Sequence, residues 1–551
     1  MLTAGLLYVT MQPKGSLPDT QFHDWYNTEH GPLRLRLPFI TNGFRFRATD
    51  GEKPEYVALY DITDMDELTR KTYLDLRTDL IKTEREKKTM AQIDVGRRLY
   101  DLVAERSSPD FRPLETRADD DAETRGSVLI AVTTTTHPDQ QAEHDRWYRE
   151  EHFDMLARVP GWRRSRLFAT AAIDPAAPRE TLALHEYAPV NGLGGDLHKA
   201  AMNTPWRNRL MSEAVTSKSR RVYDWYYTFG PAPRELASLA KPDVAGPWSS
   251  NDGRTRTFPS PTRPAVESYI TTPDNAVIPY RLEGSTDPLA PVVVLSNAIL
   301  VNWKIWDRFV DGFFARKENQ RYRVLRYHTR GRQSQSGEQT VTVDSLATDL
   351  VTLLDALRVP PKAARLIGVS LGGVTALNAS LLYPQRIAAF IACDTNSSAP
   401  ESNRKAWGDR VAMSEQEGSV DPDTKEPIVG EQLAEVTTRR WFVPESYETQ
   451  PEVLAPVKEA VRTNSLKGFA HSVNALCAYD IRERMASATV PGLFMAGAND
   501  GILPQTMQKM AADLPGGAEL KIIDRAGHLP MVEQPEAFAD VVTEFLGKID
   551  G

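Results

Sequence analysis

Short apolar runs alternate with amphipathic stretches through the second half of the chain. Six of the runs are four or five residues long and carry many Val, Ile, Leu and Phe residues, which is typical of buried strands. The stretches between them have apolar residues at helical spacing. This alternation predicts a mostly parallel, doubly wound α/β sheet. The predicted strands are 292–295, 323–327, 365–368, 389–393, 492–495 and 520–523.

The first 230 residues contain an internal repeat. The motif Trp-Tyr-x-x-Glu-His begins at Trp25 and again at Trp147. Other segments keep nearly the same offset, such as residues 97–101 with residues 220–224. In both copies the motif lies in a predicted helix that follows an apolar strand. Since self-similarity at a fixed offset indicates a repeated structural unit, we expect two copies of one fold.

After the motif helix, each copy shows strand-like runs, a second helical stretch and a closing strand. The order βαββαβ is the split βαβ arrangement of ferredoxin-like folds. With their Trp-Tyr-x-x-Glu-His helices, the copies resemble the EthD-like group of dimeric α+β-barrel domains. The resemblance implies that residues 1–115 and 126–229 are two α+β units that form one pseudo-dimeric barrel. The acidic, non-periodic stretch 117–123 is the predicted linker between them.

A proline-rich connector follows the repeats. Residues 230–264 contain seven prolines with Ser and Gly between them. Proline disfavours helix interiors and central strands, so this segment is expected to separate the repeats from the α/β region. The α/β domain then spans 265–551. Its insertion at about 396–484, between the fourth and fifth predicted strands, is the expected helical cap.

Composition and charge limit the classes of function. A chain of 551 residues with 41% hydrophobic and 25% charged residues is typical of a globular multidomain protein, and no apolar run approaches a membrane span. The opening residues lack the features of a signal peptide, which predicts a cytoplasmic location. A net charge of -8 without a basic, aromatic-rich stretch disfavours nucleic acid as a partner. Two isolated cysteines predict neither disulfides nor a metal centre.

The clearest chemical motif is Gly-Val-Ser-Leu-Gly-Gly at residues 368–373. It follows a predicted strand and begins a helical stretch, which is the context of a G-x-S-x-G nucleophile elbow. Such a turn needs flanking glycines, because a Cβ atom would collide there. Ser370 is therefore the predicted nucleophile. The alternative is a tight glycine turn closed by an ordinary serine.

A serine nucleophile needs a base within hydrogen-bond reach and a third group that orients this base. His528 follows the last predicted strand, where an α/β hydrolase places its histidine; a loop histidine without a catalytic role is the alternative. Asp500 follows the preceding strand and completes the order Ser, Asp, His. Asp394, at the end of the strand after the nucleophile helix, is the alternative acid. Either carboxylate could instead cap a helix or support a turn.

The oxyanion hole is expected to consist of two backbone N–H groups. Leu371, directly after the nucleophile, supplies the first. Ile299, in the loop after the first core strand, supplies the second. Many relatives have His-Gly where this chain has Asn297-Ala298, but a backbone donor tolerates that change. Simple loop packing is the alternative for this segment.

Several segments resemble 3-oxoadipate enol-lactonase over nearly all of residues 270–548. They are Leu295-Ser296-Asn297, Trp306-Asp307, residues 323–331, the elbow, Arg440-Trp441-Phe442 and residues 528–530. The resemblance implies the α/β-hydrolase fold and ester or lactone hydrolysis through an acyl-enzyme, without a metal or cofactor. The expected substrate-binding residues are Asn297, His328, Trp407, Trp441 and Phe442, although aromatic residues in a cap often serve only in packing.

Two departures from the lactonases limit the comparison. His328 stands where the lactonases usually have Asp, and Gly331-Arg332-Gln333-Ser334 replaces their Gly-His-Gly-x. We therefore expect a relative that acts on a different substrate.

The repeats contribute two candidate ligand-binding histidines. His30 and His152 end the Trp-Tyr-x-x-Glu-His motifs and would be the polar groups of a cleft in the barrel. In the structural alternative, Trp25 and Tyr26 are core residues and His30 is a hydrogen-bonded buried histidine. Neither copy has a second His or a Cys at metal-ligand spacing, so no metal site is expected.

The sequence thus predicts a cofactor-free serine hydrolase that cleaves an ester or lactone of a small or medium organic molecule. By analogy with other fusions, its substrate would be an aromatic or polyketide-like compound of secondary metabolism. A second hypothesis keeps the triad but changes the reaction to cyclisation, isomerisation or carbon–carbon cleavage. A third makes the barrel mainly a binding or self-association module, which would make the protein a homo-oligomer.

Overall fold

The computed structural model comprises two compact units, Met1–Ser238 with Ser249–Gly253, and Leu239–Trp248 with Arg254–Gly551. Much of the connector predicted at 230–264 lies outside the described residues. None of the helices in the described ranges combines the length and apolarity needed to cross a bilayer. The described residues are 2–35, 37, 39–78, 82–114, 117, 122–228, 236–237, 239–240, 247, 249, 253–287, 289–333, 337 and 339–551.

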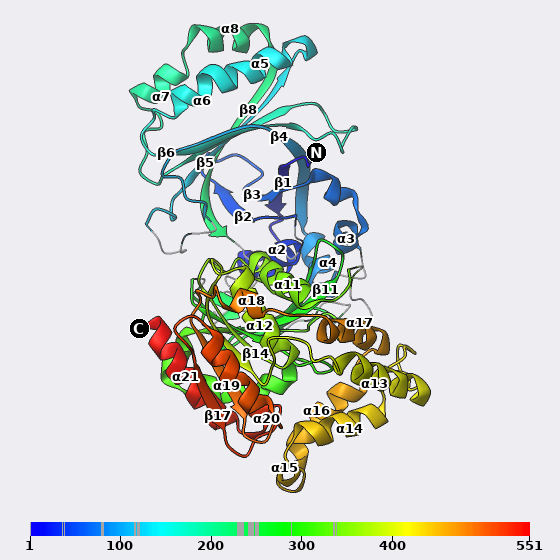
Figure 1. The fold of residues 1–551 in the computed structure, drawn as a ribbon. Coiled ribbons are helices and arrows are strands. Elements are labelled where there is room, and N and C mark those ends of the chain that lie inside the picture. Colours follow the sequence, from blue (N-terminus) through cyan, green and yellow to red (C-terminus); the bar gives the residue numbers. More distant parts are fainter. Residues whose placement is uncertain are drawn as a thin grey trace. The chain divides into compact units, whose positions relative to one another are not determined.

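The N-terminal unit is a closed barrel of eight antiparallel strands in the order β1-β3-β2-β8-β5-β7-β6-β4 (Figure 1). Pairing of β2 with β8 and of β4 with β6 joins the two repeats into one closed sheet. The strands are β1 (Gly5–Pro13), β2 (Phe44–Ala48), β3 (Tyr56–Ile62), β4 (Ile93–Ser107), β5 (Val128–Thr136), β6 (Trp162–Thr170), β7 (Thr181–Tyr187) and β8 (Val215–Thr228).

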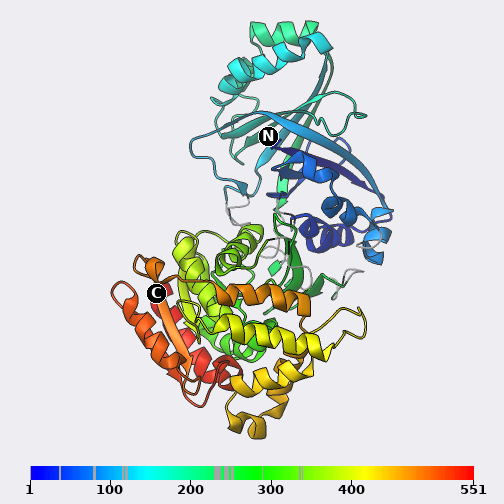
Figure 2. The ribbon, with the colours of Figure 1, turned by 45° about the vertical axis from the view of Figure 1, so that its right-hand side comes forward.

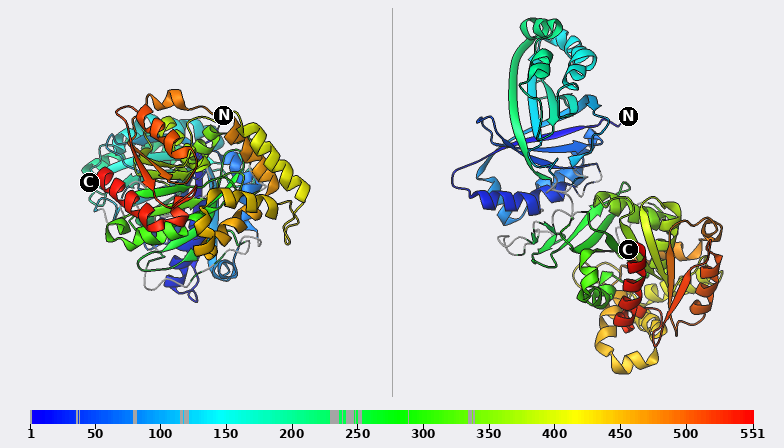
Figure 3. Two further views of the ribbon diagram at one scale, coloured as in Figure 1. Left: turned by 60° about the horizontal axis from the view of Figure 1, so that its bottom comes forward. Right: turned by 90° about the vertical axis from the view of Figure 1, so that its left-hand side faces the viewer.

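Both repeats run strand, helices, two strands, helices, strand. Alternate strand residues fill the barrel, and those on the opposite face pack beneath the helices. Figure 3 shows these helices on the outside of the barrel strands. Each Trp-Tyr-x-x-Glu-His motif passes through a π-helical turn, Tyr26–His30 or Tyr148–His152. The flanking helices are α1 (Asp19–Trp25), α2 (Gly31–Leu35), α3 (Lys71–Leu74) and α4 (Glu84–Met90) in the first repeat, and α5 (Gln141–Trp147), α6 (Phe153–Leu156), α7 (Asp196–Ala201) and α8 (Pro205–Glu213) in the second.

The C-terminal unit is built on a nine-stranded sheet in the order β17-β16-β15-β14-β12-β13-β11-β10-β9. Strands β12 to β17 pair in parallel, and β9 to β11 extend the sheet with antiparallel pairing. All six strands predicted from apolar runs lie in the parallel part. The strands are β9 (Arg256–Phe258), β10 (Ala265–Thr271), β11 (Val277–Gly284), β12 (Val292–Ser296), β13 (Arg323–Tyr327), β14 (Ala364–Val369), β15 (Ile387–Cys393), β16 (Gly492–Gly497) and β17 (Glu519–Ile523).

Helices pack on this sheet in pairs. Helix α10 (Asp307–Ala315) packs on α21 (Pro535–Asp550), and α11 (Val343–Ala356) packs on α12 (Leu371–Leu382). Helix α19 (Leu503–Asp513) packs on β16. Parallel strands end at one edge of such a sheet, so the loops after β12, β14, β15, β16 and β17 meet there.

A helical insertion lies between β15 and β16, within the segment predicted as the cap. In it, α13 packs on α17 and α14 packs on α16, and the helices gather on one side of the unit (Figure 2). The helices are α13 (Asn403–Glu417), α14 (Glu431–Trp441), α15 (Pro444–Thr449), α16 (Pro451–Arg462) and α17 (Leu466–Cys477).

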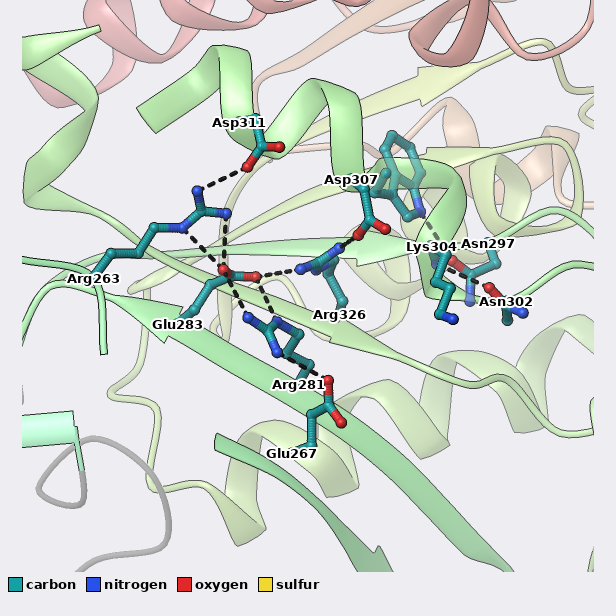
Figure 4. Close-up of polar contacts among 11 residues, drawn as sticks. Arg263, Glu267, Arg281, Glu283, Asn297, Asn302, Lys304, Asp307, Asp311 and Arg326 are labelled. Atoms are coloured by element: carbon teal, nitrogen blue, oxygen red, sulfur yellow. Dashed lines mark hydrogen bonds and ion pairs between the residues drawn. The ribbon is translucent and has the colours of Figure 1, made fainter. Parts of the chain in front are cut away.

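A buried carboxylate links the antiparallel strands to the parallel ones. Glu283 at the end of β11 is 1% exposed and pairs with Arg263, Arg281 and Arg326 (Figure 4). Burial by itself raises the pKa of the Glu283 carboxyl, but the three arginines outweigh it and hold that pKa at about 2. Each of these arginines also forms an ion pair with a second acidic residue, so the cluster is a network of ion pairs centred on Glu283.

We expect Glu283→Gln to destabilise the C-terminal unit by about 3 kcal/mol, because it leaves buried guanidinium groups without their shared carboxylate. The stabilisation by Glu283 should be present above pH 4.5 and disappear as the pH falls from 4.5 toward 2, through the depressed pKa. Urea unfolding at several pH values measures both effects. Glu267→Gln, which removes a more exposed partner of Arg281 alone, is the control and should cost less than about 1 kcal/mol. Equal stability of the two variants would contradict this assignment.

Candidate active site

Ser370 lies in the turn between β14 and α12. Its φ of 58° and ψ of −120° are unusual for a residue with a Cβ atom, so the backbone is strained there. The N–H of Ser370 donates to the carbonyl of Cys393 at 2.9 Å, and the Thr395 hydroxyl donates to the carbonyl of Ser370 at 2.8 Å. The end of β15 therefore holds the turn in its strained conformation.

The glycines of the motif permit close packing around the turn. A Cβ atom on Gly368 would lie 1.9 Å from the carbonyl oxygen of Gly372. A Cβ atom on Gly372 would lie 2.2 Å from the carbonyl oxygen of Ser296 and 2.6 Å from that of Asn297. The start of α12 therefore contacts the backbone of the loop after β12, and no larger residue fits between them.

We expect Gly372→Ala to push this loop away from α12 and to lower kcat/KM for an activated ester by about 100-fold, because displacements near 1 Å cost that much in an active site. Gly547→Ala is the control, since a Cβ atom there meets nothing within 4 Å. That variant should retain parent activity. Parent-like kinetics of Gly372→Ala would contradict the role given to this contact.

His528 and Asp500 form a hydrogen-bonded pair. The distance from His528 Nδ1 to Asp500 Oδ2 is 2.6 Å, and both side chains are mostly buried. The backbone N–H of His528 donates to the backbone carbonyl of Trp441 at 2.7 Å. The rings of these two residues also stack, with their centroids 5.7 Å apart. The imidazole is thus held from one side by a carboxylate and from another by the cap.

Glu533 anchors the loop that carries the histidine and was not identified from the sequence. Its buried carboxylate accepts hydrogen bonds from the N–H groups of Gly527 and Val443 and from the hydroxyl of Ser446. These contacts link the residue before His528 to the cap segment after α14. The only sequence signal was an acidic residue five positions after the histidine, in an otherwise apolar segment.

Asp394 lies beside Asp500 but differs from it in charge. Asp394 is 1% exposed and accepts the N–H of Gly497 at 2.9 Å. Burial, and then the negative charge of Asp500, raise the pKa of Asp394 well above its ordinary value. Burial also opposes ionisation of Asp500, but His528 outweighs it and lowers the pKa of that carboxyl. Asp500 is therefore the ionised member of the pair, and its carboxylate is the one bonded to His528.

These groups open into one cavity of about 350 Å³. Seven of the residues predicted as site candidates line it: Ser370, Leu371, Asp394, Trp407, Trp441, Asp500 and His528. Leu371 is the first residue of α12, so its N–H has no partner within the helix. The cap supplies the opposite wall, including Ala406 of α13 and Leu476 of α17.

Four residues predicted for the hydrolase site are not among those that line this cavity. Asn297 is fully buried, where it donates to the carbonyl of Tyr327 at 2.6 Å and accepts from the indole of Trp306 at 2.9 Å. Ile299 and Phe442 are buried as well. Asn297 thus holds the loop that carries Ile299 rather than facing the cavity.

His328 is the fourth of these residues. Its ring stacks on Trp303 with the centroids 4.0 Å apart. Burial, followed by the charges of Arg332 and Lys304, lowers the pKa of His328 to about 3. The imidazole is therefore neutral near pH 7, and its aromatic contact is with Trp303 rather than with the cavity.

Two arginines of the cap line the cavity, and their role was not recognised from the sequence. Arg410 of α13 lies 4.5 Å from the centre of the Trp407 ring and Arg440 of α14 lies 5.6 Å from it. Neither forms a salt bridge within the described part of the chain. Burial, and then Arg410, lower the pKa of Arg440 to about 10, so both side chains are cations near pH 7. The cavity thus combines an apolar wall with two positive charges.

The candidate histidines of the barrel differ from each other. His30 is buried, and its Nδ1 lies 2.8 Å from the carboxylate of Glu86. His152 is buried against Trp147, with ring centroids 4.3 Å apart, and lines a small cavity. Within the described ranges, no group of three or more His, Cys, Asp or Glu residues could hold a metal ion.

The C-terminal unit is similar in sequence to known hydrolases. Residues 291–535 match the family described as "alpha/beta hydrolase fold". The 3-oxoadipate enol-lactonase 2 of Acinetobacter baylyi is 27% identical over 49% of this chain and 93% of its own length, and enol-lactonase 1 of that organism is 27% identical over 47% and 90%. The C-terminal half is therefore an α/β hydrolase related to 3-oxoadipate enol-lactonase. A crystal structure of the enol-lactonase from Burkholderia xenovorans LB400 is 26% identical, covers 51% of this chain and 99% of its own, and has a TM-score of 0.44.

Proposed function

We propose that the C-terminal unit hydrolyses an ester or lactone of a small or medium organic acid through an acyl-enzyme on Ser370. The observation that carries the proposal is the 2.6 Å pair of His528 and Asp500, which opens into the same cavity as a serine in a strained strand-to-helix turn. A base oriented by a carboxylate beside a serine is the arrangement that activates a hydroxyl for acyl transfer.

In the proposed mechanism, the carboxylate of Asp500 accepts a hydrogen bond from the Nδ1–H group of His528, which leaves the Nε2 lone pair free to act as base. Ser370 attacks the carbonyl carbon while His528 takes the hydroxyl proton, and Asp500 stabilises the imidazolium. The N–H groups of Leu371 and Ile299 stabilise the oxyanion. The imidazolium then protonates the leaving alkoxide, and a water activated by His528 releases the acid from Ser370.

The wall of the cavity indicates the substrate class. Arg410 and Arg440 provide positive charge on the cap side of the cavity, and both lie against the aromatic ring of Trp407. Buried or partly buried arginines favour carboxylate or phosphate groups, which they bind with paired hydrogen bonds. The proposed substrate therefore carries a negatively charged group that binds against the cap.

We expect Arg440→Gln to lower kcat/KM about tenfold for mono-4-nitrophenyl succinate, which is anionic, and less for 4-nitrophenyl acetate, which is neutral. Steady-state kinetics on the two esters measure this difference. Arg439→Gln is the control, because Arg439 is the neighbouring arginine of α14, is exposed and pairs with Glu435. A loss of equal size on both esters would contradict a charge-reading role for Arg440.

Turnover of an ester in oxygen-18 water tests the reaction type. Hydrolysis through the acyl-enzyme places one labelled oxygen in the product acid and none in the alcohol. An unlabelled product or an isomer of the substrate would instead support the cyclising or isomerising alternative and reject hydrolysis.

For the N-terminal unit, we propose an EthD-like pair of α+β repeats at 1–115 and 126–229 that forms the pseudo-dimeric barrel. Support comes from the closed eight-stranded sheet and from the π-helical turn at the same motif in both repeats.

A further inference from the structure

The second repeat of the barrel contains a cavity of about 40 Å³ between its sheet and its helices. It is separate from the hydrolase site and lies wholly within the N-terminal unit. Its wall combines apolar and aromatic side chains, among them Trp147, Tyr148 and Leu156, with histidines and cations. None of the residues that line it is acidic.

The two repeats can be compared position by position at the last helix of each, α4 and α8. Thr83 caps α4 and bonds to the third helical residue, Glu86; its hydroxyl also donates to Glu29 of the motif. Thr204 caps α8 in the same way, bonding to the third residue, Arg207, and donating to Glu151 of the second motif. Glu86 and Arg207 therefore occupy equivalent positions with opposite charge.

This reversal changes the surroundings of the motif histidine. In the first repeat the carboxylate of Glu86 bonds to His30 at 2.8 Å. In the second repeat the equivalent histidine, His152, is 5% exposed and faces Arg207 instead. Burial, and then the charges of His185 and Arg207, lower the pKa of His152 well below its ordinary value. The second repeat thus lacks the carboxylate that completes this position in the first.

Two equivalent arginines, Arg97 and Arg220, also differ in their bonding partners. Arg97 lies opposite Val9 in the first repeat, and Arg220 lies opposite Val132 in the second. Arg97 donates to the hydroxyl of Tyr73 at 2.8 Å. Arg220 forms no ion pair within the described residues, and neither does Lys218 two residues before it.

Three cations therefore lie around the same cavity. Burial, followed by Arg207 and Arg220, lowers the pKa of Lys218, as expected where positive charges lie close together without a counter-charge. Clustered cations that line a cavity favour the entry of an anion, because an anion relieves their mutual repulsion. The apolar wall beyond them favours a ligand with a hydrocarbon body.

We propose that the second repeat binds a short-chain carboxylate, whose carboxylate group takes the position at His152 that the Glu86 carboxylate holds at His30 in the first repeat. Its hydrocarbon part would lie against Trp147, Tyr148 and Leu156. A cavity of about 40 Å³ has room for roughly three water-sized groups, so only a short-chain ligand can enter it.

Histidine ring NMR of the full-length protein tests this site directly. The protein is labelled with carbon-13 at the histidine Cε1 atoms, and the His152 signal is assigned with His152→Gln. Butyrate is the probe, butyramide is its neutral control, and the ionic strength is kept constant with chloride. We expect the His152 signal to shift saturably with butyrate, with a dissociation constant on the order of 1 mM, and not to shift with butyramide. The His528 signal reports separately on any butyrate in the hydrolase cavity.

A pair of charge-matched variants locates the anion. Arg207→Glu introduces a carboxylate at the position of Glu86, so it should weaken butyrate binding at least about tenfold, with the signals of the histidines outside the cavity unchanged. Arg209→Glu makes the same change on an exposed position of α8 that does not line the cavity, and it should retain binding. The proposal is overturned if His152 does not respond to butyrate, if butyramide acts equally, or if Arg207→Glu binds as tightly as the parent.

Discussion

Ser370→Ala should lower kcat for ester hydrolysis by about 10⁵- to 10⁶-fold, the largest effect expected of any single substitution in this protein. The reason is that the acyl-enzyme cannot form without the hydroxyl, while the oxyanion donors and the cavity remain in place. The turnover of 4-nitrophenyl acetate, followed under conditions that exclude contaminating esterases, measures the loss.

Ser402→Ala is the control for this result. Ser402 lines the same cavity but lies in the cap. Removing its hydroxyl should change kcat by no more than a few-fold. If Ser370→Ala retained more than about one-hundredth of parent activity, another nucleophile would have to be sought in the cavity.

The second large effect concerns the two neighbouring carboxyl groups. Asp500→Asn should lower kcat about 10⁴-fold, because an amide can stabilise the wrong tautomer of His528 and cannot stabilise its cation. Asp394→Asn should cost about tenfold at most. Burial and the neighbouring charge of Asp500 raise the pKa of Asp394 well above its ordinary value and so favour its neutral form, whose size and lack of charge asparagine keeps.

The comparison of these two isosteric variants distinguishes the acid from its neighbour. Steady-state kinetics and the melting temperature should be measured together, so that a folding defect is not mistaken for lost catalysis. If Asp394→Asn were as inactive as Asp500→Asn, the proton distribution between the two carboxyl groups would be different from the one inferred from their burial.

Local sterics made the elbow predictable from the sequence. A Cβ atom added at Gly368 or Gly372 would lie closer than 2.5 Å to a backbone atom, so only glycine fits at these two positions. This requirement appears in the sequence as the Gly-x-Ser-x-Gly motif. Most of the six parallel strands were equally predictable, because strands buried on both faces are rich in apolar residues. The barrel strands were predicted instead from the internal repeat.

Other features depend on contacts between distant segments. Asn297 was expected to face the substrate, but the sequence does not show in which direction a loop side chain points. In the structure its amide is hydrogen-bonded to Tyr327 and Trp306. The two cap arginines acquire their role only when α13 and α14 pack over the elbow. The equivalent histidines His30 and His152 have the same motif and opposite surroundings, because their partners come from helices more than fifty residues further along the chain.

Intact-mass analysis after reaction with a fluorophosphonate tests the central claim most directly. The parent protein should gain the mass of one adduct, located at Ser370 by peptide sequencing. Ser370→Ala should gain none, and His528→Ala should react far more slowly because the hydroxyl has lost its base. An adduct of equal yield on Ser370→Ala, or on a residue outside the cavity, would contradict the assignment of Ser370 as the nucleophile.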